Sequence, residues 1–293
     1  MTVGLLHPGE MGATVGATVM AGGERVLWAS EGRSPATRAR AREIGLEDAG
    51  TLAALVRASR VIVSVVPPHG ALDLARAVAT LGFDGIYVDT NAVAPETARE
   101  IGRVVEAVGG RFVDGGIIGP AARRRGAARI YLAGPAAPEI ATLLGAGPLD
   151  AIVLDAPAGA ASALKMAFAA WNKGSQALLA AVRAFAIAEG VDAALLAEWK
   201  TSRPDLPARS EQVFSDNARK AWRFVGEMDE IARSLASAGL PAGFHEAARE
   251  IYRRLSEYKD AGTAPPVEES AARLLRPVMA GSGARRPASE RGV

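Results

Sequence analysis

Lys165 is the one charged side chain between Ala158 and Trp171, in a long run of Ala, Leu, Met and Phe. On a helix, Asn172 and Gln176 fall within about 20° of the line through Lys165, so the run carries a narrow polar stripe. Apolar surroundings lower the pKa of an ammonium group toward values useful for proton transfer. The alternative is a lysine whose stem lies along the helix while its charge reaches solvent. The stripe marks a candidate acid/base, whose role depends on what faces it.

A second candidate group is the segment His7-Pro8-Gly9-Glu10-Met11-Gly12, between a short apolar run and a helical stretch. A dinucleotide fingerprint reads G-x-G-x-x-G at such a turn, and here His7 replaces its first glycine. Gly9 then lets the backbone approach a pyrophosphate, and Gly12 lets the helix pack closely on the strand. The helix N-terminus adds free N–H groups. An ordinary tight turn is the alternative, but the position favours a dinucleotide site formed by these six residues.

The end of the second predicted strand bears on which dinucleotide binds. NAD-binding enzymes place an acidic side chain there for the ribose diol, and Glu31 comes one or two positions later than that. Ser30, Arg33 and Ser34 suit a 2′-phosphate instead, because the guanidinium fork of arginine matches phosphate oxygens. The alternative for the arginine is a solvated helix start. The segment favours NADP over NAD.

Three further loops are predicted at the carboxyl ends of strands, where ligands bind in open α/β sheets. Val66 and Pro67 form a rigid apolar wall suited to adenine or nicotinamide, and Asn91 brings an amide near the nicotinamide. The third loop, residues 115–120, is rich in glycine and precedes a triple arginine, residues 123–125. Such a run is typical of a solvated loop, with a contact to substrate or cofactor as the alternative.

These candidates need elements that hold them, and the pattern of the chain indicates two kinds. Over the first half, apolar runs of strand length alternate with helical stretches, which predicts βαβ units. We expect an α/β protein with a doubly wound, mainly parallel Rossmann-type sheet in residues 1–157. An all-α domain, residues 158–277, begins with a long interdomain helix. Residues 278–293 are rich in Gly, Ser, Arg and Pro, which predicts a disordered tail.

The bulk composition limits the function further. The 293 residues carry a formal net charge of +2, too close to balance to indicate a nucleic-acid or membrane partner. There is no cysteine, which excludes disulfides, thiolate catalysis and zinc sites of the cysteine type. The three histidines are not spaced as metal ligands, so no metal is expected. No signal-peptide pattern and no apolar run of membrane length is visible, so we expect a cytoplasmic protein.

Four segments together resemble the β-hydroxyacid dehydrogenase superfamily, which includes 6-phosphogluconate and 3-hydroxyisobutyrate dehydrogenases and the imine reductases. They are residues 4–12, 89–97 and 114–126 and the helix around Lys165. The sequence motifs HPGEMG, EGRSPAT and ASALKM are similar to those of a poorly characterised 6-phosphogluconate dehydrogenase-like branch. The resemblance implies an NADP(H)-linked oxidoreductase with Lys165 as general acid/base. It also implies a homodimer whose helical domains intertwine.

The resemblance implies where a small-molecule substrate binds, and two positions depart from the family pattern. The family's Ser-Gly-Gly falls on Ile118-Gly119-Pro120, so its serine is missing. The family's asparagine four residues after the lysine is Ala169, and Asn172 takes its place in orienting the substrate. These changes favour larger or less acidic substrates, as in imine reductases, although those usually lack the lysine. We predict hydride transfer at a hydroxyl or carbonyl carbon, with imine reduction or a non-catalytic NADP-binding protein as alternatives.

Overall fold

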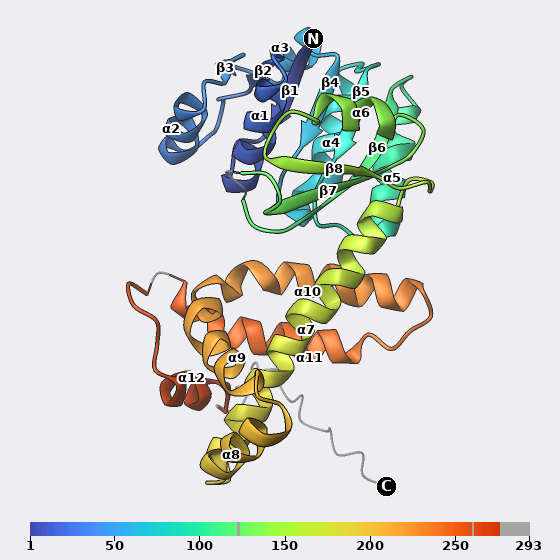
Figure 1. Ribbon diagram of the computed structural model, residues 1–293. Coiled ribbons are helices and arrows are strands. Elements are labelled where there is room, and N and C mark those ends of the chain that lie inside the picture. The colour runs from blue at the N-terminus through green and yellow to red at the C-terminus, as the bar shows by residue number, and fades with distance from the viewer. Residues whose placement is uncertain (122–123, 260, 276–293) are drawn as a thin grey trace, which may run out of the picture.

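The computed structural model describes residues 1–121, 124–259 and 261–275. Figure 1 shows an α/β lobe that contains the N-terminus and a helical lobe below it, with α7 (Ala160–Ala188) running from one into the other. The first strand runs from the N-terminus toward the helical lobe (Figure 1). Groups at the carboxyl ends of the parallel strands therefore lie between the two lobes.

Within the described residues, eight strands form one sheet in the order β3-β2-β1-β4-β5-β6-β7-β8. They are β1 (Thr2–Leu6), β2 (Arg25–Trp28), β3 (Glu47–Asp48), β4 (Val61–Ser64), β5 (Ile86–Asp89), β6 (Arg111–Ile118), β7 (Ala128–Ala133) and β8 (Leu149–Val153). Neighbouring strands are parallel except for β6 and β7. The chain order reverses between β1 and β4, the switch point at which such sheets bind ligands. The predicted fold class is confirmed.

Helices cover both faces of the sheet, which buries its parallel strands on each side. They are α1 (Glu10–Ala21), α2 (Pro35–Glu43), α3 (Leu52–Ala58), α4 (Ala71–Thr80), α5 (Pro95–Glu106) and α6 (Ala137–Leu143). Residues of β1 serve two cores in alternation, since Val3 and Leu5 pack in one apolar cluster and Leu6 packs in the other. This is why β1 is a continuous apolar run in the sequence.

The glycine-rich segment after Asp114 differs from the prediction, because it extends β6 and is not a loop. A Cβ on Gly115 would lie 2.8 Å from the Asp89 carbonyl oxygen, and a Cβ on Gly116 would lie 2.6 Å from the Ala161 carbonyl oxygen of α7. Both distances are too short for a side chain. The two glycines therefore serve close packing within a strand, and the turn signal that glycine gives in a sequence was wrong here.

The helical lobe packs around α7. Its other helices are α8 (Asp192–Ser202), α9 (Leu206–Gln212), α10 (Ala221–Ser237), α11 (Gly243–Leu255) and α12 (Val267–Leu274). A π-helical turn (Val213–Asn217) and a 3₁₀ turn (Ala218–Lys220) join α9 to α10, and two more 3₁₀ turns are Pro68–Gly70 and Ser256–Tyr258. Met166 of α7 is buried with Phe214, Met228 and Tyr252 in the core of this lobe.

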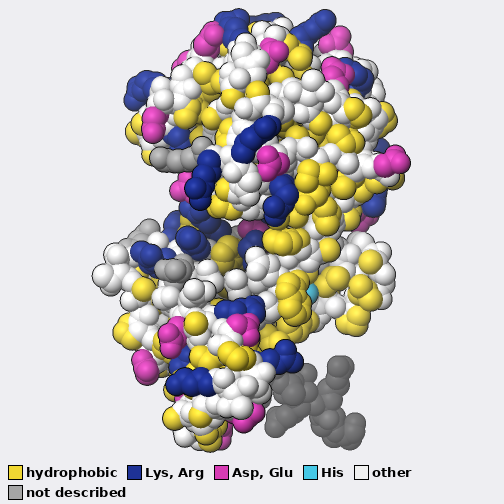
Figure 2. Space-filling model, in the orientation of Figure 1, with side chains coloured by type: hydrophobic (Ala, Val, Ile, Leu, Met, Phe, Trp, Pro, Cys, Tyr) yellow, Lys and Arg dark blue, Asp and Glu magenta, His cyan; other side chains and the backbone are white. Residues whose placement is uncertain are grey.

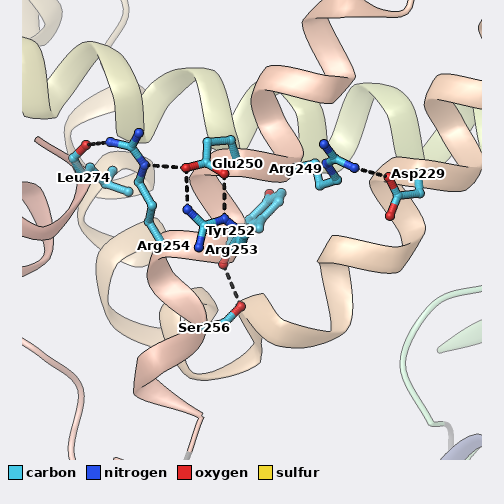
Figure 3. Close-up of polar contacts among 8 residues, drawn as sticks. All are labelled: Asp229, Arg249, Glu250, Tyr252, Arg253, Arg254, Ser256 and Leu274. Carbon is cyan, nitrogen blue, oxygen red and sulfur yellow. Dashed lines mark hydrogen bonds and ion pairs between the residues drawn. The ribbon is translucent and has the colours of Figure 1, made fainter. Parts of the chain in front are cut away.

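Polar contacts fasten α11 to its neighbours (Figure 3). Arg249 pairs with Asp229 of α10 at 2.9 Å. Arg254 pairs with Glu250 one turn before it at 2.8 Å and donates to the Leu274 carbonyl at the end of α12. These contacts, with the apolar core, hold α10, α11 and α12 together against α7.

Three predictions concern the start of the helical region, the C-terminal tail and the absence of a membrane-spanning helix. The helical stretch predicted from residue 158 begins at Ala160. The tail predicted for residues 278–293 lies outside the described residues, and so does Arg123 of the triple arginine. Across the part of the chain that the structure describes, no helix combines the length and the apolar character needed to span a membrane.

Asp114, which pairs in register with Asp89 of the neighbouring strand, fixes the start of α7. Its Oδ2 accepts hydrogen bonds from the N–H groups of Gly159, Ala161 and Ser162 at 2.8, 2.9 and 3.1 Å. Its Oδ1 accepts the Ser162 hydroxyl at 2.6 Å. A carboxylate is a favourable partner for the first N–H groups of a helix, which form the positive end of the helix dipole. Four hydrogen bonds thus attach α7 to the sheet.

Glu230 of α10 makes a similar contact in the opposite direction. Its Oε2 accepts the N–H of Ala94, just before α5, at 2.7 Å, and its Oε1 accepts Arg233 at 2.9 Å. The carboxylate is buried, and these two donors satisfy it. Two of the contacts between the lobes are therefore of one kind, in which a carboxylate of one lobe binds backbone N–H groups at a helix start of the other.

Asp89 is fully buried beside Asp114. Burial and the charge of Asp114 raise the pKa of Asp89 to about 7, against the opposing effect of hydrogen bonds from Asn91. Asp114 receives four donors from α7, so it is the better placed of the two to carry the negative charge. Asp89 is then the carboxyl that keeps its proton near neutral pH.

We predict that Asp89→Asn removes a pH-dependent loss of stability. The folded protein holds the Asp89 proton up to about pH 7, whereas the unfolded chain loses it near pH 3.8, so the free energy of unfolding falls as pH rises through this interval. The variant has no such proton. Its free energy of unfolding, measured with urea relative to the wild type, should rise across that interval and level off above it.

Asp48→Asn is the matched control. Burial raises the pKa of Asp48, but hydrogen bonds from Ser30 and from the Gly50 N–H outweigh this and hold it below the usual value. The difference between this variant and the wild type should therefore be constant above about pH 5. Parallel pH curves for Asp89→Asn and the wild type would contradict the assignment.

Candidate active site

The candidate residues gather at the waist between the two lobes. Figure 2 shows the narrowing of the molecule there and the Lys and Arg side chains that cluster on this face of it. The turn after β1 and the loops after β4 and β5 open at the carboxyl edge of the sheet. The switch point and the start of α7 therefore face the same interlobe space.

The turn after β1 fits the phosphates of a dinucleotide. A Cβ on Gly12 would lie 1.9 Å from the His7 carbonyl oxygen, so only glycine lets α1 start so close to β1. Above Gly9 there is open space, with nothing within 4 Å of a Cβ. Gly9 precedes α1 and brings no side chain to its first N–H groups, which stay available to an anion. Gly9 and Gly12 thus fulfil the two demands of the fingerprint.

The other residues of this turn have separate roles. Burial, with the nearby charge of Arg33, lowers the pKa of His7 to about 4, so its imidazole is neutral. Its Nδ1 is buried and has no hydrogen-bond partner. The Pro8 carbonyl accepts Arg40 of α2 at 3.1 Å, and Met11 packs against the sheet core. Two arginines that follow β2 therefore border the fingerprint turn.

The segment after β2 has one cation near the turn and two hydroxyls that are already engaged. Arg33 lies close enough to His7 for its charge to lower the imidazole pKa. Ser34 caps α2, since its Oγ accepts the Thr37 N–H at 3.3 Å. Ser30 is buried and donates to Asp48 of β3. Of the predicted phosphate group, Arg33 is thus the member whose charge acts on the turn, through the pKa of His7.

Asn91 lies inside the structure and connects two loops. Its Oδ1 accepts the Val66 N–H at 2.6 Å, and its Nδ2 donates to Ser64 Oγ at 3.0 Å and to the Asp89 carboxyl. Both amide hydrogens are therefore used within the protein. Asn91 thus fixes the backbone at Val66, directly after β4 at the switch point.

Lys165 lies beside the end of β6. Its Nζ donates to the Ile117 carbonyl at 2.6 Å, and its stem passes over Gly116, where a Cβ would lie 3.2 Å from Lys165 Cβ. Burial lowers the pKa of Lys165, Glu227 of α10 raises it and Lys173 lowers it, with burial the largest effect. The lysine does not extend along α7 into solvent. It is held in the interlobe space, and because its pKa is lowered, it loses its proton more easily than an exposed lysine does.

The charges nearest to Lys165 are those of Lys173, two turns further along α7, and of Glu227 on α10. Lys173 forms an ion pair with Glu227, and its ammonium lies 5.1 Å from the centre of the Phe224 ring. The hydroxyl of Tyr252 donates to the Lys173 carbonyl at 2.7 Å. Glu227 thus has a closer partner than Lys165, and among the residues whose side chains the structure describes no carboxylate forms an ion pair with Lys165.

The remaining predicted residues are not gathered around Lys165 as expected. Asn172 is exposed, two turns further along α7. Ile118 is buried as the last residue of β6 and pairs with Arg129 of β7. Gly119 follows with a φ of 123°, and Pro120 is exposed. The segment 118–120 follows the Ile117 carbonyl that binds Lys165, and it lacks the hydroxyl of the family motif.

Sequence reasoning missed the carboxylates that position this site. Asp114 is a single acid at the end of an apolar run, and Glu230 is one of three acids in residues 227–230, so neither stood out as a site residue. Two cavities lie elsewhere: one of about 580 Å³ lies between α4, α5 and α10, and an apolar one of about 370 Å³ lies between α5, α7 and α10. Neither is lined by Lys165 or by residues 7–12.

Comparison with known families gives two matches along the chain. The NAD binding domain of 6-phosphogluconate dehydrogenase matches residues 2–144, and a domain of unknown function, DUF1932, matches residues 186–255. The first match covers the sheet lobe and its fingerprint turn. The second covers α8 to α11 and so belongs to the helical lobe.

Individual relatives extend over both lobes. An uncharacterized 28.5 kDa protein of Methanothermus fervidus is 30% identical over 180 residues, 61% of this chain and 68% of the relative. A conserved protein of unknown function, described as structurally similar to 3-hydroxyacid dehydrogenases, is 31% identical with a TM-score of 0.68, over 88% of this chain and 98% of its own.

Two more distant structures share the fold. The 3-hydroxyisobutyrate dehydrogenase of Mycobacterium tuberculosis, solved with L-serine, has a TM-score of 0.66 at 18% identity, over 94% of this chain and 99% of its own. An imine reductase of Streptomyces aurantiacus has a TM-score of 0.50 at 18% identity, over 94% and 100%. By its NAD binding domain and its relatives of 30% and 31% identity, the chain belongs to the 6-phosphogluconate dehydrogenase-like superfamily.

Proposed function

We propose that the protein is an NADP(H)-dependent oxidoreductase that transfers a hydride between nicotinamide and a hydroxyl or carbonyl carbon of a small molecule, with Lys165 as general acid/base. One observation carries the proposal: the Lys165 ammonium is held against the Ile117 carbonyl, in the same interlobe space onto which the fingerprint turn opens. A proton donor and a dinucleotide site on one side of the sheet are what reversible hydride transfer requires.

Each residue then has a defined task. The bound dinucleotide supplies or accepts the hydride. Lys165 gives its proton to the carbonyl oxygen in reduction and takes it from the hydroxyl in oxidation. Burial lowers the ammonium pKa, which makes the ammonium a better proton donor and increases the fraction of neutral amine that can accept the hydroxyl proton. The Ile117 carbonyl keeps Nζ in position until a substrate oxygen replaces it. Asn91 holds the Val66–Pro67 wall, and Asn172 extends the polar stripe toward a larger substrate.

Arg33 supports the preference for NADP. Arg33 follows β2, where the adenine ribose of a dinucleotide on this turn would lie, and its charge is near enough to lower the pKa of His7. Ser30 and Ser34 contribute mainly by fixing this segment, because their hydroxyls bind Asp48 and cap α2. We therefore assign the 2′-phosphate to Arg33.

Imine reduction remains the second candidate because of residues 118–120. Ile118 and Pro120 offer no side-chain hydroxyl to a substrate carboxylate, and Ile118 is buried and apolar. A neutral C=N substrate needs no carboxylate ligand. The retained Lys165 favours carbonyl chemistry, so the two candidates differ in whether that lysine is required.

Lys165→Ala tests the chemistry. We expect NADPH-dependent reduction of a carbonyl substrate, found with a panel of hydroxyacids, ketones and cyclic imines, to fall by at least about 10²-fold in kcat, because the proton donor is lost. Lys200→Ala, an exposed lysine of α8, is the matched control and should keep full activity. Imine turnover that persists in Lys165→Ala would support the second candidate, and NADPH binding without any turnover would indicate a non-catalytic protein.

Arg33→Ala tests the choice of dinucleotide. We expect the Kd for NADPH to rise about tenfold or more while the Kd for NADH stays within about twofold, because the two differ only in the 2′-phosphate. Fluorescence titration of both dinucleotides measures the ratio. An unchanged ratio would remove Arg33 from the phosphate site.

The outer face of α7 supports self-association through the helical lobe. Its exposed apolar positions are spaced alternately by four and three residues: Leu164, Phe168, Trp171, Leu178, Val182 and Phe185, with Ser175 completing the series. Trp171 is 76% exposed and Phe185 is 62% exposed. A seven-residue apolar repeat on a helix is the seam by which two helices pack together, and a large exposed apolar strip marks an interface. A second copy of α7 fits this face, so we propose a homodimer.

Trp171→Glu tests the homodimer. A buried charge in the middle of the strip is expected to convert the dimer into monomers at low micromolar concentration, as measured by light scattering after size-exclusion chromatography. Leu240→Glu, an exposed apolar residue in the α10–α11 connection, is the control that should leave the dimer intact. A wild-type protein that is already monomeric would contradict the proposal.

A further inference from the structure

One contact between the lobes is made inside the fingerprint turn. Arg223, near the start of α10, donates from Nη1 to Glu10 Oε2 at 3.0 Å. Glu10 is the first residue of α1, so its own N–H is one of the groups that would face a dinucleotide phosphate. Figure 1 shows the N-terminal end of α10 below the start of α1. The helical lobe therefore places a guanidinium in contact with the first residue of α1, at the turn that would bind the phosphates.

Other cations meet at the same point. The hydrogen bond and charge of Arg223 lower the pKa of Glu10, and the charges of Arg40 and Lys220 lower it further. Arg40 is fixed by the Pro8 carbonyl, and Lys220 ends the 3₁₀ turn that precedes α10. Around one carboxylate there are thus cations from α2 of the sheet lobe and from the start of α10. Three cations therefore surround a single carboxylate, so net positive charge remains at this point after Glu10 is neutralised.

The Glu10–Arg223 pair is easily exchanged. Both side chains are about half exposed, and an ion pair in such a setting contributes little to stability. A pyrophosphate on the free N–H groups of α1 would approach the Glu10 carboxylate, and two like charges there repel each other. A guanidinium that turns from the carboxylate to the phosphate removes this repulsion and gains a fork-shaped, charge-assisted contact.

We propose that Arg223 is a dinucleotide ligand supplied by the helical lobe: on binding, its guanidinium exchanges the Glu10 carboxylate for the pyrophosphate. The inference rests on the proposed function, since it assumes that a dinucleotide binds the turn after β1. It assigns Arg223 to the pyrophosphate, which NADPH and NADH share. Loss of Arg223 should therefore weaken the binding of both dinucleotides, whereas loss of Arg33 should weaken the binding of NADPH alone. Binding then couples the position of α10 to the occupied turn.

Equilibrium binding of NADPH and NADH to the full chain tests this exchange. Arg223→Gln should raise the Kd of both by about the same factor, roughly tenfold, and should make binding less dependent on salt. Glu10→Gln should lower both Kd values by about two- to fivefold, because the repulsive carboxylate is gone. Arg209→Gln is the control and should change neither, because Arg209 of α9 pairs with Asp205, the residue just before that helix.

The outcomes are distinguishable. If the wild type binds neither dinucleotide, the proposed function and this inference both fail. If the wild type binds but Arg223→Gln leaves both Kd values unchanged, or if Glu10→Gln weakens binding as Arg223→Gln does, the pair is only a tether between the lobes and the inference alone is overturned. Thermal unfolding of each variant verifies that it is folded, and Arg223→Lys should restore part of the affinity because it keeps the charge.

Discussion

The hydrogen bonds between Asp114 and the first turn of α7 determine where the rest of the molecule lies. They fix the origin and direction of a 29-residue helix on one point of the sheet. A small angular change at this origin would move the far end of α7, and with it α10 and α11, by several ångströms. Glu230 supplies the second attachment, at the start of α5. With two such contacts, the helical lobe is fixed in rotation as well as in position.

The close approach of α7 to β6 follows from the same anchor. A helix start that is bonded to Asp114 must pass over the next residues of the strand, and Gly115 and Gly116 leave room for it. The Lys165 side chain then lies one helical turn beyond the anchor and reaches the Ile117 carbonyl. The position of the proposed acid/base is thus a consequence of how the two domains are joined. Asp89, whose pKa burial and the Asp114 charge raise to about 7, lies next to that junction.

The two functional halves differ in how they use charge. Around Lys165, burial disfavours the charged ammonium, and Glu227, which could stabilise it, is already paired with Lys173. Around the fingerprint turn, several cations surround Glu10, which lies directly at the helix start. The first environment suits a group that releases and takes up a proton, and the second suits a ligand with several negative charges. Both face the interlobe space, as a reaction between a dinucleotide and a small molecule requires.

The sequence by itself determined the alternation of strands and helices, the fingerprint turn with Gly9 and Gly12, and Lys165 as the unusual charge on a long apolar helix, because these are local patterns of periodicity and backbone demand. It did not reveal the two-residue β3, whose Glu47 and Asp48 have no strand pattern, or that residues 115–118 are strand. Tertiary structure decided the tasks of Asp114, Asn91, Glu230 and Arg223, since each depends on a partner far away in the chain. Short-range patterns record what a residue does to its own backbone, whereas only packing decides which distant groups it meets.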